Sequence, residues 1–319
     1  MKKKIGLVTG GAGFIGSHLA ERLLSDNWKI IILDNLSTGF KTNIPKKASF
    51  VLLDLSKDGF IKRIPRLKYD AIFHLAAQSS GEISFDDPLY DAKTNCLSTL
   101  SLLKWCYSSG IKRFIFTSSM SIYGDQGDMP VKETALPNPK SFYGIGKLAS
   151  EKYVDVFSKM GLQTTSLRLF NVYGPGQNME NLRQGMVSIY MAYILKKQKL
   201  IVKGSLERYR DFVYIDDVIG AYMDCLSNSN SFGKTYNIAT GKKTYIKKLI
   251  DLELNTFGYK KDEYPIQLSS STPGDTIGIF ADIKTIQRDI GWNPRVPLSA
   301  GIKKMASWCL GLKNSKGKE

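Results

Sequence analysis

The sequence predicts an α/β protein of the Rossmann type, with a doubly wound parallel sheet and helices on both faces. Strand-like runs alternate with helix-length segments through the first half of the chain, a pattern typical of βαβ units. Several of these runs, such as Ile30–Leu33, are apolar throughout, as expected of strands buried on both faces. The predicted strands are Ile5–Thr9, Ile30–Leu33, Phe50–Leu53, Ala71–Leu75, Phe114–Thr117 and Thr165–Leu169.

The pattern of the sequence changes after Asn171. Gly174-Pro175-Gly176 predicts a turn, which is followed by a helical stretch near residues 187–197 and then by short strands and turns. The run Phe212–Ile215, followed by a helix from Asp216, predicts a return to the main sheet. We therefore expect a Rossmann domain over residues 1–170, with a return segment at about 210–240. Residues 171–209 and 241–319 are expected to form a smaller C-terminal α/β lobe.

Composition narrows the classes of partner. The 319 residues carry 45 Lys and Arg against 29 Asp and Glu, a net charge of +16 that favours anionic ligands of any kind. The charges are scattered rather than gathered into a stripe with interleaved aromatic residues, which argues against nucleic acid. The longest uncharged apolar stretch, residues 184–195, falls short of the ~20 residues that cross a bilayer, so we expect no membrane partner and a cytoplasmic protein.

The chain has few residues of the types that usually bind metal ions. The four cysteines form no C-x-x-C pair, and there are two histidines, so we expect neither a metal site nor a disulfide framework. A Ser-His-Asp triad is disfavoured for the same reason.

Three glycines, Gly10, Gly13 and Gly16, follow the first predicted strand and open a helix-like segment. Such glycines permit a tight turn and let backbone N–H groups approach a pyrophosphate at the helix N-terminus. Asp34, at the end of the next strand, has the offset expected of an acid that binds the ribose hydroxyls. Its charge would repel a 2′-phosphate, so NAD is predicted rather than NADP; the alternative is a structural turn with a surface Asp.

Tyr143 and Lys147 are four residues apart in a predicted helix over residues 141–160, which places both side chains on one face. A nearby ammonium and a cationic nicotinamide would stabilise the phenolate and make Tyr143 a base. Ser119 follows the strand Phe114–Thr117, where a sheet of this kind opens its ligand crevice. The alternative is a chance spacing of a buried Tyr and a surface Lys.

Two glycines, Gly144 and Gly146, lie inside this predicted helix. Each costs a helix ~1 kcal/mol relative to Ala, so a tertiary or functional reason is expected. The sequence does not identify it.

Taken together, several motifs resemble the extended short-chain dehydrogenases/reductases. The likeness is closest to the NAD-dependent epimerase/dehydratase family, to which UDP-galactose 4-epimerase belongs, and it spans nearly the whole chain. The motifs are Thr9-Gly10-Gly11-Ala12-Gly13-Phe14-Ile15-Gly16, His74-Leu75-Ala76-Ala77, Ser118-Ser119 with Tyr123-Gly124, Tyr143-x-x-x-Lys147, residues 168–175, residues 210–217, Pro273-Gly274-Asp275 and Gly291-Trp292-Asn293-Pro294.

The resemblance implies roles for individual residues. The implied catalytic residues are Ser119, Tyr143 and Lys147. Those implied to hold NAD are Gly10, Gly13, Phe14, Ile15, Gly16, Asp34, Asn35, Asp54, Leu55, Leu75, Ala76, Ala77, Tyr143 and Lys147. Those expected to meet a nucleotide-diphosphate sugar in the C-terminal lobe are Ser119, Asn171, Arg208, Arg210 and Asp275. Arg210 could instead form a surface pair with Asp211 or Asp216.

The chain departs from the family pattern at two places. Dehydratases and decarboxylases of this group carry an acid two residues after the catalytic Ser or Thr, whereas here that position is Ser121, which argues against 4,6-dehydratase chemistry. UDP-sugar epimerases often carry an Arg before the Pro-Gly-Asp motif, whereas here that position is Thr272, which puts UDP in doubt. Arg208, close to Arg210, is a candidate replacement.

The leading hypothesis is NAD-dependent oxidation at C4 of a nucleotide-activated sugar, giving the 4-epimer through a 4-keto intermediate. One alternative is a nucleotide-sugar 4-dehydrogenase that releases the ketone, which would use the same residues. Another is a non-catalytic NAD-binding regulator, since fold does not fix function. The resemblance also suggests a homodimer joined through the helices that begin near Asp87 and Ser141.

Overall fold

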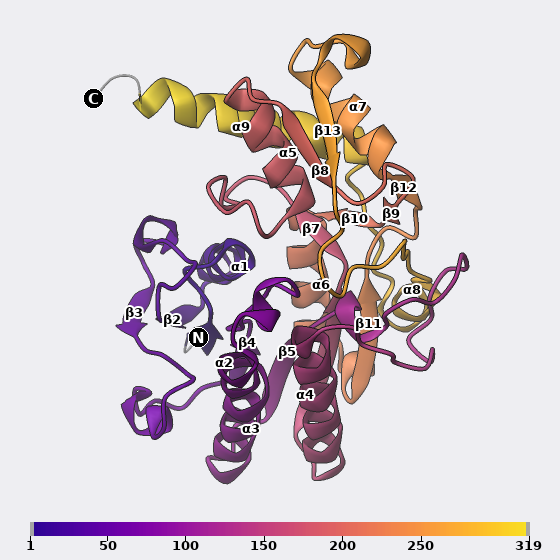
Figure 1. The fold of residues 1–319 in the computed structure, drawn as a ribbon. Helices are drawn as coiled ribbons and strands as arrows, with labels where there is room; N and C mark the ends of the chain where they lie inside the picture. Colours follow the sequence, from indigo (N-terminus) through magenta and orange to yellow (C-terminus); the bar gives the residue numbers. More distant parts are fainter. Residues whose placement is uncertain (1–2, 317–319) are drawn as a thin grey trace.

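The computed structural model describes residues 3–316 and confirms the predicted fold class. Seven parallel strands form the central sheet in the order β11-β6-β5-β4-β1-β2-β3 (Figure 1). Three two-stranded sheets, β10-β7, β12-β9 and β13-β8, lie outside it. The strands of the main sheet are β1 (Ile5–Thr9), β2 (Lys29–Asp34), β3 (Ser49–Leu52), β4 (Ala71–His74), β5 (Arg113–Ser119), β6 (Gln163–Leu169) and β11 (Lys234–Ile238).

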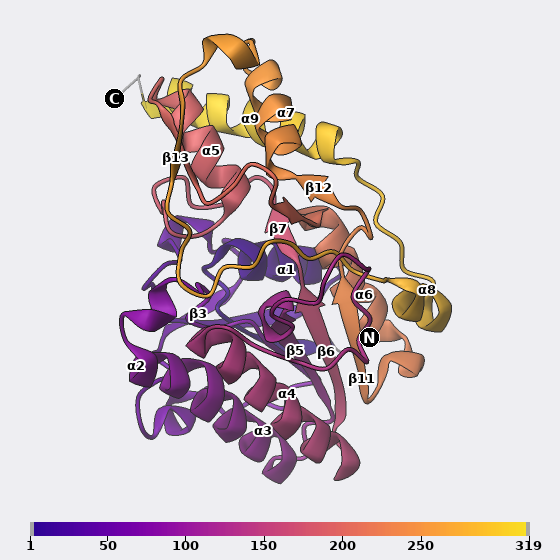
Figure 2. The ribbon, with the colours of Figure 1, turned by 45° about the vertical axis from the view of Figure 1, so that its right-hand side comes forward.

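Helices cover both faces of this sheet (Figures 1 and 2). Helix α1 packs against α6 on one face, and α3 packs against α4 on the other. The helices are α1 (Phe14–Ser25), α2 (Pro88–Ala92), α3 (Ser98–Ser108), α4 (Phe142–Lys159), α5 (Met186–Leu195), α6 (Ile215–Ser227), α7 (Ile246–Thr256), α8 (Lys284–Ile290) and α9 (Leu298–Lys316).

The second lobe gathers α5, α7 and α9 with the short sheet β13-β8, above the carboxyl ends of the main strands in Figure 1. Its short strands are β7 (Asn171–Tyr173), β8 (Leu200–Lys203), β9 (Tyr209–Arg210), β10 (Phe212–Tyr214), β12 (Thr244–Tyr245) and β13 (Ile266–Ser269). Strand β6 runs directly into β7, so the two lobes are connected at the edge where the main strands end.

The prediction that Phe212–Ile215 returns to the main sheet is wrong for the strand and right for the helix after it. Residues 212–214 form β10, which pairs in parallel with β7. The place beside β6 is taken by β11. This strand sits at the sheet edge and its sequence, Lys-Thr-Tyr-Asn-Ile, lacks the apolar run that marks the central strands. Helix α6 nevertheless packs on β5 and α1.

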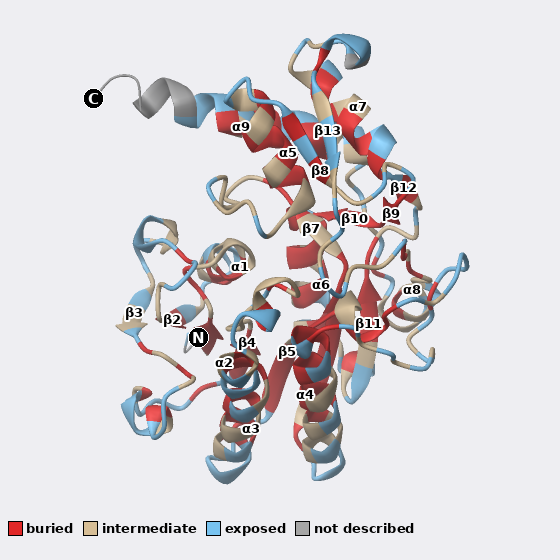
Figure 3. Ribbon diagram, viewed as in Figure 1, coloured by how far each residue is buried: buried red, intermediate tan, exposed pale blue. Residues whose placement is uncertain are grey.

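Buried side chains fill the space between the sheet and its helices, whereas the outer faces of α3 and α4 are exposed (Figure 3). Strands β1 and β2 are almost fully buried, as their uniformly apolar sequences predict. Because all seven strands are parallel, their carboxyl ends lie along one edge of the sheet, where doubly wound folds bind ligands. Within residues 3–316, no helix has the length and apolar character needed to span a bilayer.

Candidate active site

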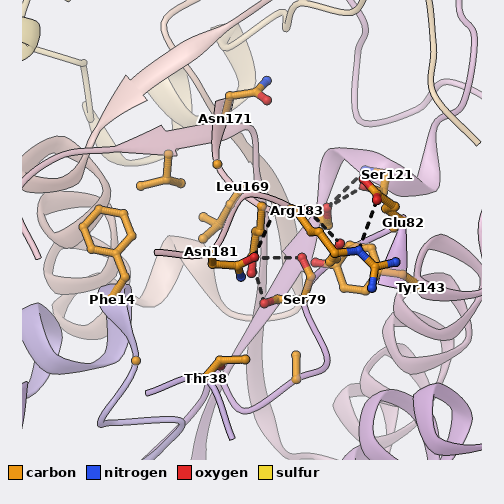
Figure 4. A pocket seen from close by; sticks show the side chains of 18 of the residues that line it. Phe14, Thr38, Ser79, Glu82, Ser121, Tyr143, Leu169, Asn171, Asn181 and Arg183 are labelled. Carbon is orange, nitrogen blue, oxygen red and sulfur yellow. Dashed lines mark hydrogen bonds and ion pairs between the residues drawn. The ribbon is translucent and has the colours of Figure 1, made fainter. Parts of the chain in front are cut away.

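A cavity of about 560 Å³ lies at the carboxyl edge of the main sheet, between it and the second lobe. All the predicted catalytic, cofactor-binding and substrate-binding residues line it. They come from the ends of β1 to β6, from α4 and from the loops of the second lobe, and several appear as sticks in Figure 4. Within the described residues, no cluster of three or more His, Cys, Asp or Glu could hold a metal ion.

The glycines of the turn after β1 pack against neighbouring backbone so closely that no side chain would fit. Gly10 has a φ of +71°, and a Cβ there would lie 2.7 Å from the backbone nitrogen of Ala76. At Gly16 a Cβ would lie 2.1 Å from the carbonyl oxygen of Gly10. Gly13 caps the N-terminus of α1 with extended backbone. The turn is therefore a cradle of backbone at a helix N-terminus, which fits a dinucleotide pyrophosphate.

Polar side chains continue this surface at the ends of β2 and β3. Backbone N–H groups fix the Asp34 carboxylate, because Oδ2 accepts from Ala12 at 3.0 Å and Oδ1 accepts from Leu36 at 2.8 Å. Asp54 Oδ1 accepts from the backbone and hydroxyl of Ser56 at 2.9 and 2.7 Å. Both carboxylates line the cavity and keep free lone pairs for hydroxyl groups. The cradle and its two acids fit NAD.

Ser119, Tyr143 and Lys147 converge on one wall of the cavity. Ser119 ends β5, and Tyr143 and Lys147 lie one turn apart near the start of α4, whose cap is Ser141. A hydrogen bond from Ser119 acts to lower the pKa of Tyr143. The Lys147 ammonium donates to the carbonyl oxygen of Thr117 at 2.9 Å and is 2% exposed. All three residues are thus held by backbone elements of the Rossmann domain.

The acid–base state of this group differs from the sequence-based expectation in one respect. Burial raises the pKa of Tyr143 to about 12, against the hydrogen bond from Ser119, and the charge of Asp91 raises it further. Lys147 is not among the groups that lower it, since its ammonium is directed to Thr117 and lies 5.9 Å from the Tyr143 ring centre. The protein by itself therefore keeps the phenol protonated at neutral pH.

The two glycines of α4 allow the helix to approach its neighbours closely. At Gly144 a Cβ would lie 2.5 Å from the carbonyl oxygen of Ser121, in the loop after β5. At Gly146 it would lie 3.2 Å from Cβ of Asn95 and 3.3 Å from Oδ1 of Asp91. The helix that carries Tyr143 is therefore pressed against the loop of Ser119 on one side and against residues 91–95 on the other.

Two arginines share one carboxylate at the opposite end of the cavity. Arg210 Nη2 lies 2.5 Å from Oδ1 of Asp275, and Arg208 pairs with Oδ2 of the same residue. Both guanidinium groups are more than nine-tenths buried. The alternative surface pairing of Arg210 is not what the structure shows, because Arg210 is buried against Asp275. The Asp211 carboxylate is taken by backbone groups of residues 240, 241 and 281, and Asp216 pairs with Lys304 at 3.9 Å. The cluster carries a net positive charge facing the cavity.

Other predicted substrate residues lie nearby. Asn171 donates its amide to the carbonyl oxygen of Asp211 at 3.2 Å and contacts the sulfur of Met120. Ser121 stands where a dehydratase would carry its acid, and its hydroxyl oxygen lies 3.1 Å from that of Ser119. Thr272 begins the turn that ends at Asp275, whose backbone N–H donates to the Thr272 carbonyl at 3.1 Å. Arg208 and Thr272 are therefore neighbours through Asp275.

Sequence reasoning missed a charged strap that crosses between the lobes. Arg183 Nε lies 3.1 Å from Glu82 and its Nη1 lies 2.6 Å from Asp86, while Lys203 approaches Glu82 at 2.9 Å. Gln184 donates to Ser79 in the same loop at 2.8 Å, and Figure 4 shows Arg183 and Glu82 on the Tyr143 side of the cavity. The partners lie about 100 residues apart in the chain, so no local signal could have identified them.

We expect Gly144→Ala to lower both stability and activity, although Ala favours a helix by ~1 kcal/mol over Gly. The added methyl group would meet the Ser121 carbonyl oxygen, so either α4 or the Ser119 loop must move. Gly311→Ala is the matched control, because that helical glycine has open space around its Cβ position. Thermal unfolding of both variants tests this, and a Gly144→Ala protein as stable as Gly311→Ala would contradict it.

Comparison with known proteins gives a consistent assignment. A sequence model of the NAD dependent epimerase/dehydratase family matches residues 6–239. A protein of Methanocaldococcus jannaschii that carries the provisional name UDP-glucose 4-epimerase is 36% identical over 304 residues, which cover 95% of this chain and 97% of that protein.

Solved structures agree in fold along the whole length. The UDP-glucose 4-epimerase of Thermotoga maritima, solved with UDP-glucose, is 34% identical with a TM-score of 0.92, and the match covers 97% of this chain and 99% of that one. The UDP-glucose 4-epimerase of Thermus thermophilus, solved with NAD, is 32% identical with a TM-score of 0.89, covering 96% and 99%. The chain described here belongs to the NAD-dependent epimerase/dehydratase family of extended short-chain dehydrogenases/reductases.

Proposed function

We propose that this protein is a UDP-hexose 4-epimerase that uses NAD, with Tyr143 as its acid–base group. The observation that carries the proposal is the convergence of Ser119, Tyr143 and Lys147 in the same cavity as a dinucleotide cradle and a buried arginine pair. A regulator that only bound NAD would need neither the catalytic wall nor the arginines. Relatives named as UDP-sugar 4-epimerases match nearly the full chain, which supports the same activity.

The Rossmann domain, residues 1–170 with the return segment, is proposed to hold the cofactor. The glycine turn would take the pyrophosphate, Asp34 the adenosine ribose, and Lys147 the nicotinamide ribose, because its ammonium has two N–H groups left after Thr117. The remaining wall is contributed by Phe14, Ile15, Asn35, Asp54, Leu55, Leu75, Ala76 and Ala77. When bound, NAD supplies the hydride acceptor and donor for C4.

Tyr143 then takes the proton of the sugar 4-hydroxyl while Ser119 hydrogen-bonds the same oxygen. Burial keeps the phenol protonated in the protein alone, so ionisation of Tyr143 depends on positive charge that enters the cavity with the oxidised cofactor. Coupling the base to cofactor binding in this way prevents a reactive phenolate from forming in an empty site. The product of this half-reaction is a 4-keto sugar that is planar at C4.

The substrate is proposed to be anchored by its diphosphate at Arg208 and Arg210, in the lobe formed by residues 171–209 and 241–319. Guanidinium groups bind phosphate oxygens through paired N–H donors, and these two have one carboxylate between them. Asp275 and Asn171 supply further polar contacts. An anchor at the diphosphate would leave the ketone free to turn, so that its other face could receive hydride from the reduced cofactor while Tyr143 returns the proton to the oxygen.

Two related reactions are less well supported. Elimination of water from C6 needs an acid close to Ser119, and the position two residues on is Ser121, whose hydroxyl is a far weaker acid than a carboxylic acid. A 4-dehydrogenase would use the same residues but would release the ketone. Retention of the ketone is favoured by the strap of Arg183 and Glu82, which ties the two lobes together beside Tyr143.

Incubation of the purified protein with UDP-glucose, UDP-N-acetylglucosamine, UDP-glucuronic acid and GDP-mannose, followed by product analysis, tests the activity and its sugar. We expect the 4-epimer of at least one UDP-sugar and no accumulated 4-keto sugar. Tyr143→Phe should lower kcat by at least ~100-fold with NAD still bound. Tyr153→Phe, on the same helix, is the control and should keep full activity. A complete lack of epimer across the panel would refute the proposal.

Arg208→Ala should raise KM for the UDP-sugar ~10- to 100-fold, since a charged hydrogen bond to phosphate contributes ~1.5–3 kcal/mol. Adding Thr272→Arg should recover much of the loss, because Thr272 lies in the turn that presents Asp275 to Arg208. The exposed Arg288→Ala provides a control of equal charge change. Inhibition by UDP should weaken in step while inhibition by uridine stays constant; an unchanged KM would show that Arg208 does not bind phosphate.

A homodimer is proposed on the outer face of α2, α3 and α4. Helix α4 carries a stripe with Ile145 and Val156 exposed by more than half, and the neighbouring segment exposes Leu89 and Leu97. Helix α4 contacts both α2, which carries Leu89, and the segment of residues 93–97, which ends at Leu97. Such an apolar patch favours self-association.

We also propose that the protein works in the cytoplasm, where nucleotide sugars are made.

Light scattering should give twice the 35.7 kDa mass of the chain. Ile145→Glu together with Leu97→Glu should yield a folded monomer, because two charges would enter the apolar interface. Leu268→Glu, on the exposed strand β13, makes the same change elsewhere and should leave the dimer intact. A monomeric wild-type protein at micromolar concentration would count against this interface.

A further inference from the structure

A buried carboxylate lies beside the catalytic helix and has no part in the chemistry described so far. Asp91, on α2, is 1% exposed. Its Oδ2 accepts a hydrogen bond from the amide of Gln78 at 2.8 Å. Its Oδ1 has no hydrogen bond of good geometry within the described part of the chain, and the Asn95 amide is close enough only to lower the pKa of the carboxyl. A buried carboxylate oxygen without a donor is costly, so a compensating positive charge is expected nearby.

The chain packs Asp91 tightly against the residue before Lys147. A Cβ at Gly146 would lie 3.3 Å from Asp91 Oδ1, so the missing side chain is what admits the carboxylate to the surface of α4. Helices α2 and α4 are in contact along this stretch. The glycine that appeared unfavourable in the sequence therefore brings a negative charge close to the backbone of α4, from where it acts on Lys147 through space, without an ion pair within 4.0 Å.

Lys147 is a cation without a dedicated ion-pair partner among the described residues. Its ammonium donates to the Thr117 carbonyl and lies 5.0 Å from the centre of the Phe116 ring. Two carboxylates act on it, those of Asp91 and Glu151. Glu151, however, already forms a buried bidentate pair with Arg168, at 2.9 Å to Nε and 2.8 Å to Nη2. Its charge is compensated, whereas Asp91 has only amide donors.

We propose that Asp91 is a positioning residue that keeps Lys147 protonated and fixed toward the cavity during the reaction. This inference rests on the proposed function, because it deepens the role of Lys147 at that site. Asp91 does not line the cavity in which the substrate and cofactor are proposed to bind. It acts through the charge of Lys147.

The titration behaviour agrees with this geometry. Burial lowers the pKa of Lys147 to about 8, and the charges of Asp91 and Glu151 oppose that shift. Burial raises the pKa of Asp91, while nearby amides and Lys147 lower it. On β4, burial and Lys147 hold the pKa of His74 at about 3, so this imidazole stays neutral. Two phenols also lie here, those of Tyr143 and of Tyr222, which hydrogen-bonds the Thr117 side chain. Burial raises the pKa of both, to about 12 for Tyr143, so both stay neutral.

The direction of the expected effect follows from the sign of the charge. A carboxylate favours the ammonium form, so removing it should lower the pKa of Lys147 below about 8. The alkaline limb of kcat/KM, where Lys147 loses its proton, should then move to lower pH. Activity near pH 6.5 should change much less than activity near pH 8.

The experiment compares pH profiles of kcat/KM for wild type, Asp91→Asn and Asp87→Asn. Asp87 caps the same helix from an exposed position, so its variant makes the same chemical change without altering the field at Lys147. We expect the alkaline limb of Asp91→Asn to move down by at least one pH unit, and that of Asp87→Asn to stay in place. A reduced activity with an unmoved limb would show that Asp91 has only a structural role and would overturn the proposal.

A double-mutant cycle on stability keeps the proposal testable without turnover. Asp91→Asn, Lys147→Met and the double variant are unfolded by denaturant at pH 7. If Asp91 compensates Lys147, the loss caused by Asp91→Asn should largely vanish in the Lys147→Met background, and a single variant that fails to fold should be rescued there. Additive losses, or a double variant that also fails to fold, would refute the pairing. Because the cycle needs no substrate, it separates failure of this inference from absence of epimerase activity.

Discussion

The burial of a single ammonium group is the constraint on which the site depends. Lys147 must reach the cavity from within the Rossmann domain, where desolvation opposes its charge. The surrounding structure offsets that cost through a carbonyl at the end of β5, an aromatic face and two carboxylates. These groups come from separate parts of the chain, so the lysine is a functional charge only when β5, α2 and α4 are assembled together.

Close packing of α4 is the means by which this assembly is held. The glycines at 144 and 146 weaken α4 locally, but because they lack side chains the helix can pack closely against its neighbours. A buried hydrogen-bond network anchors the far side of the helix. In this network Arg168 joins Glu151 on α4 to the phenol of Tyr123, and Tyr123 donates to Asn237 on β11. Helix α4 is thereby fixed both to the Ser119 loop and to the edge strand. This support holds the side chains of Ser119, Tyr143 and Lys147 in place.

The parts of the molecule that sequence could predict are those set by local pattern. Apolar runs and the glycine turn place β1 and β2 to within a residue, and the carboxyl edge of a parallel sheet then gathers the site residues into one cavity. The edge strand β11 has no continuous apolar run that would predict it, because its buried positions include Asn237, whose side chain hydrogen-bonds Tyr123. Strand β10 was misplaced because a short apolar run before a helix resembles a βα unit. The strap at Arg183, the shared carboxylate of Asp275 and the raised pKa of Tyr143 arise from contacts between distant segments, which no local pattern records.

The arginine pair illustrates why a missing motif residue need not mean a missing function. Phosphate binding depends on the positions of the positive charges and N–H donors, whichever loop supplies them. The turn from Thr272 to Asp275 carries no arginine. Its Asp275 carboxylate instead pairs with Arg208, the residue directly before β9, as well as with Arg210 on β9. With one negative charge between two buried cations, the cluster retains a positive charge that an incoming diphosphate can neutralise. We therefore propose that Arg208 takes over the phosphate contact that the family pattern places at position 272, so that the departure at Thr272 is compatible with UDP.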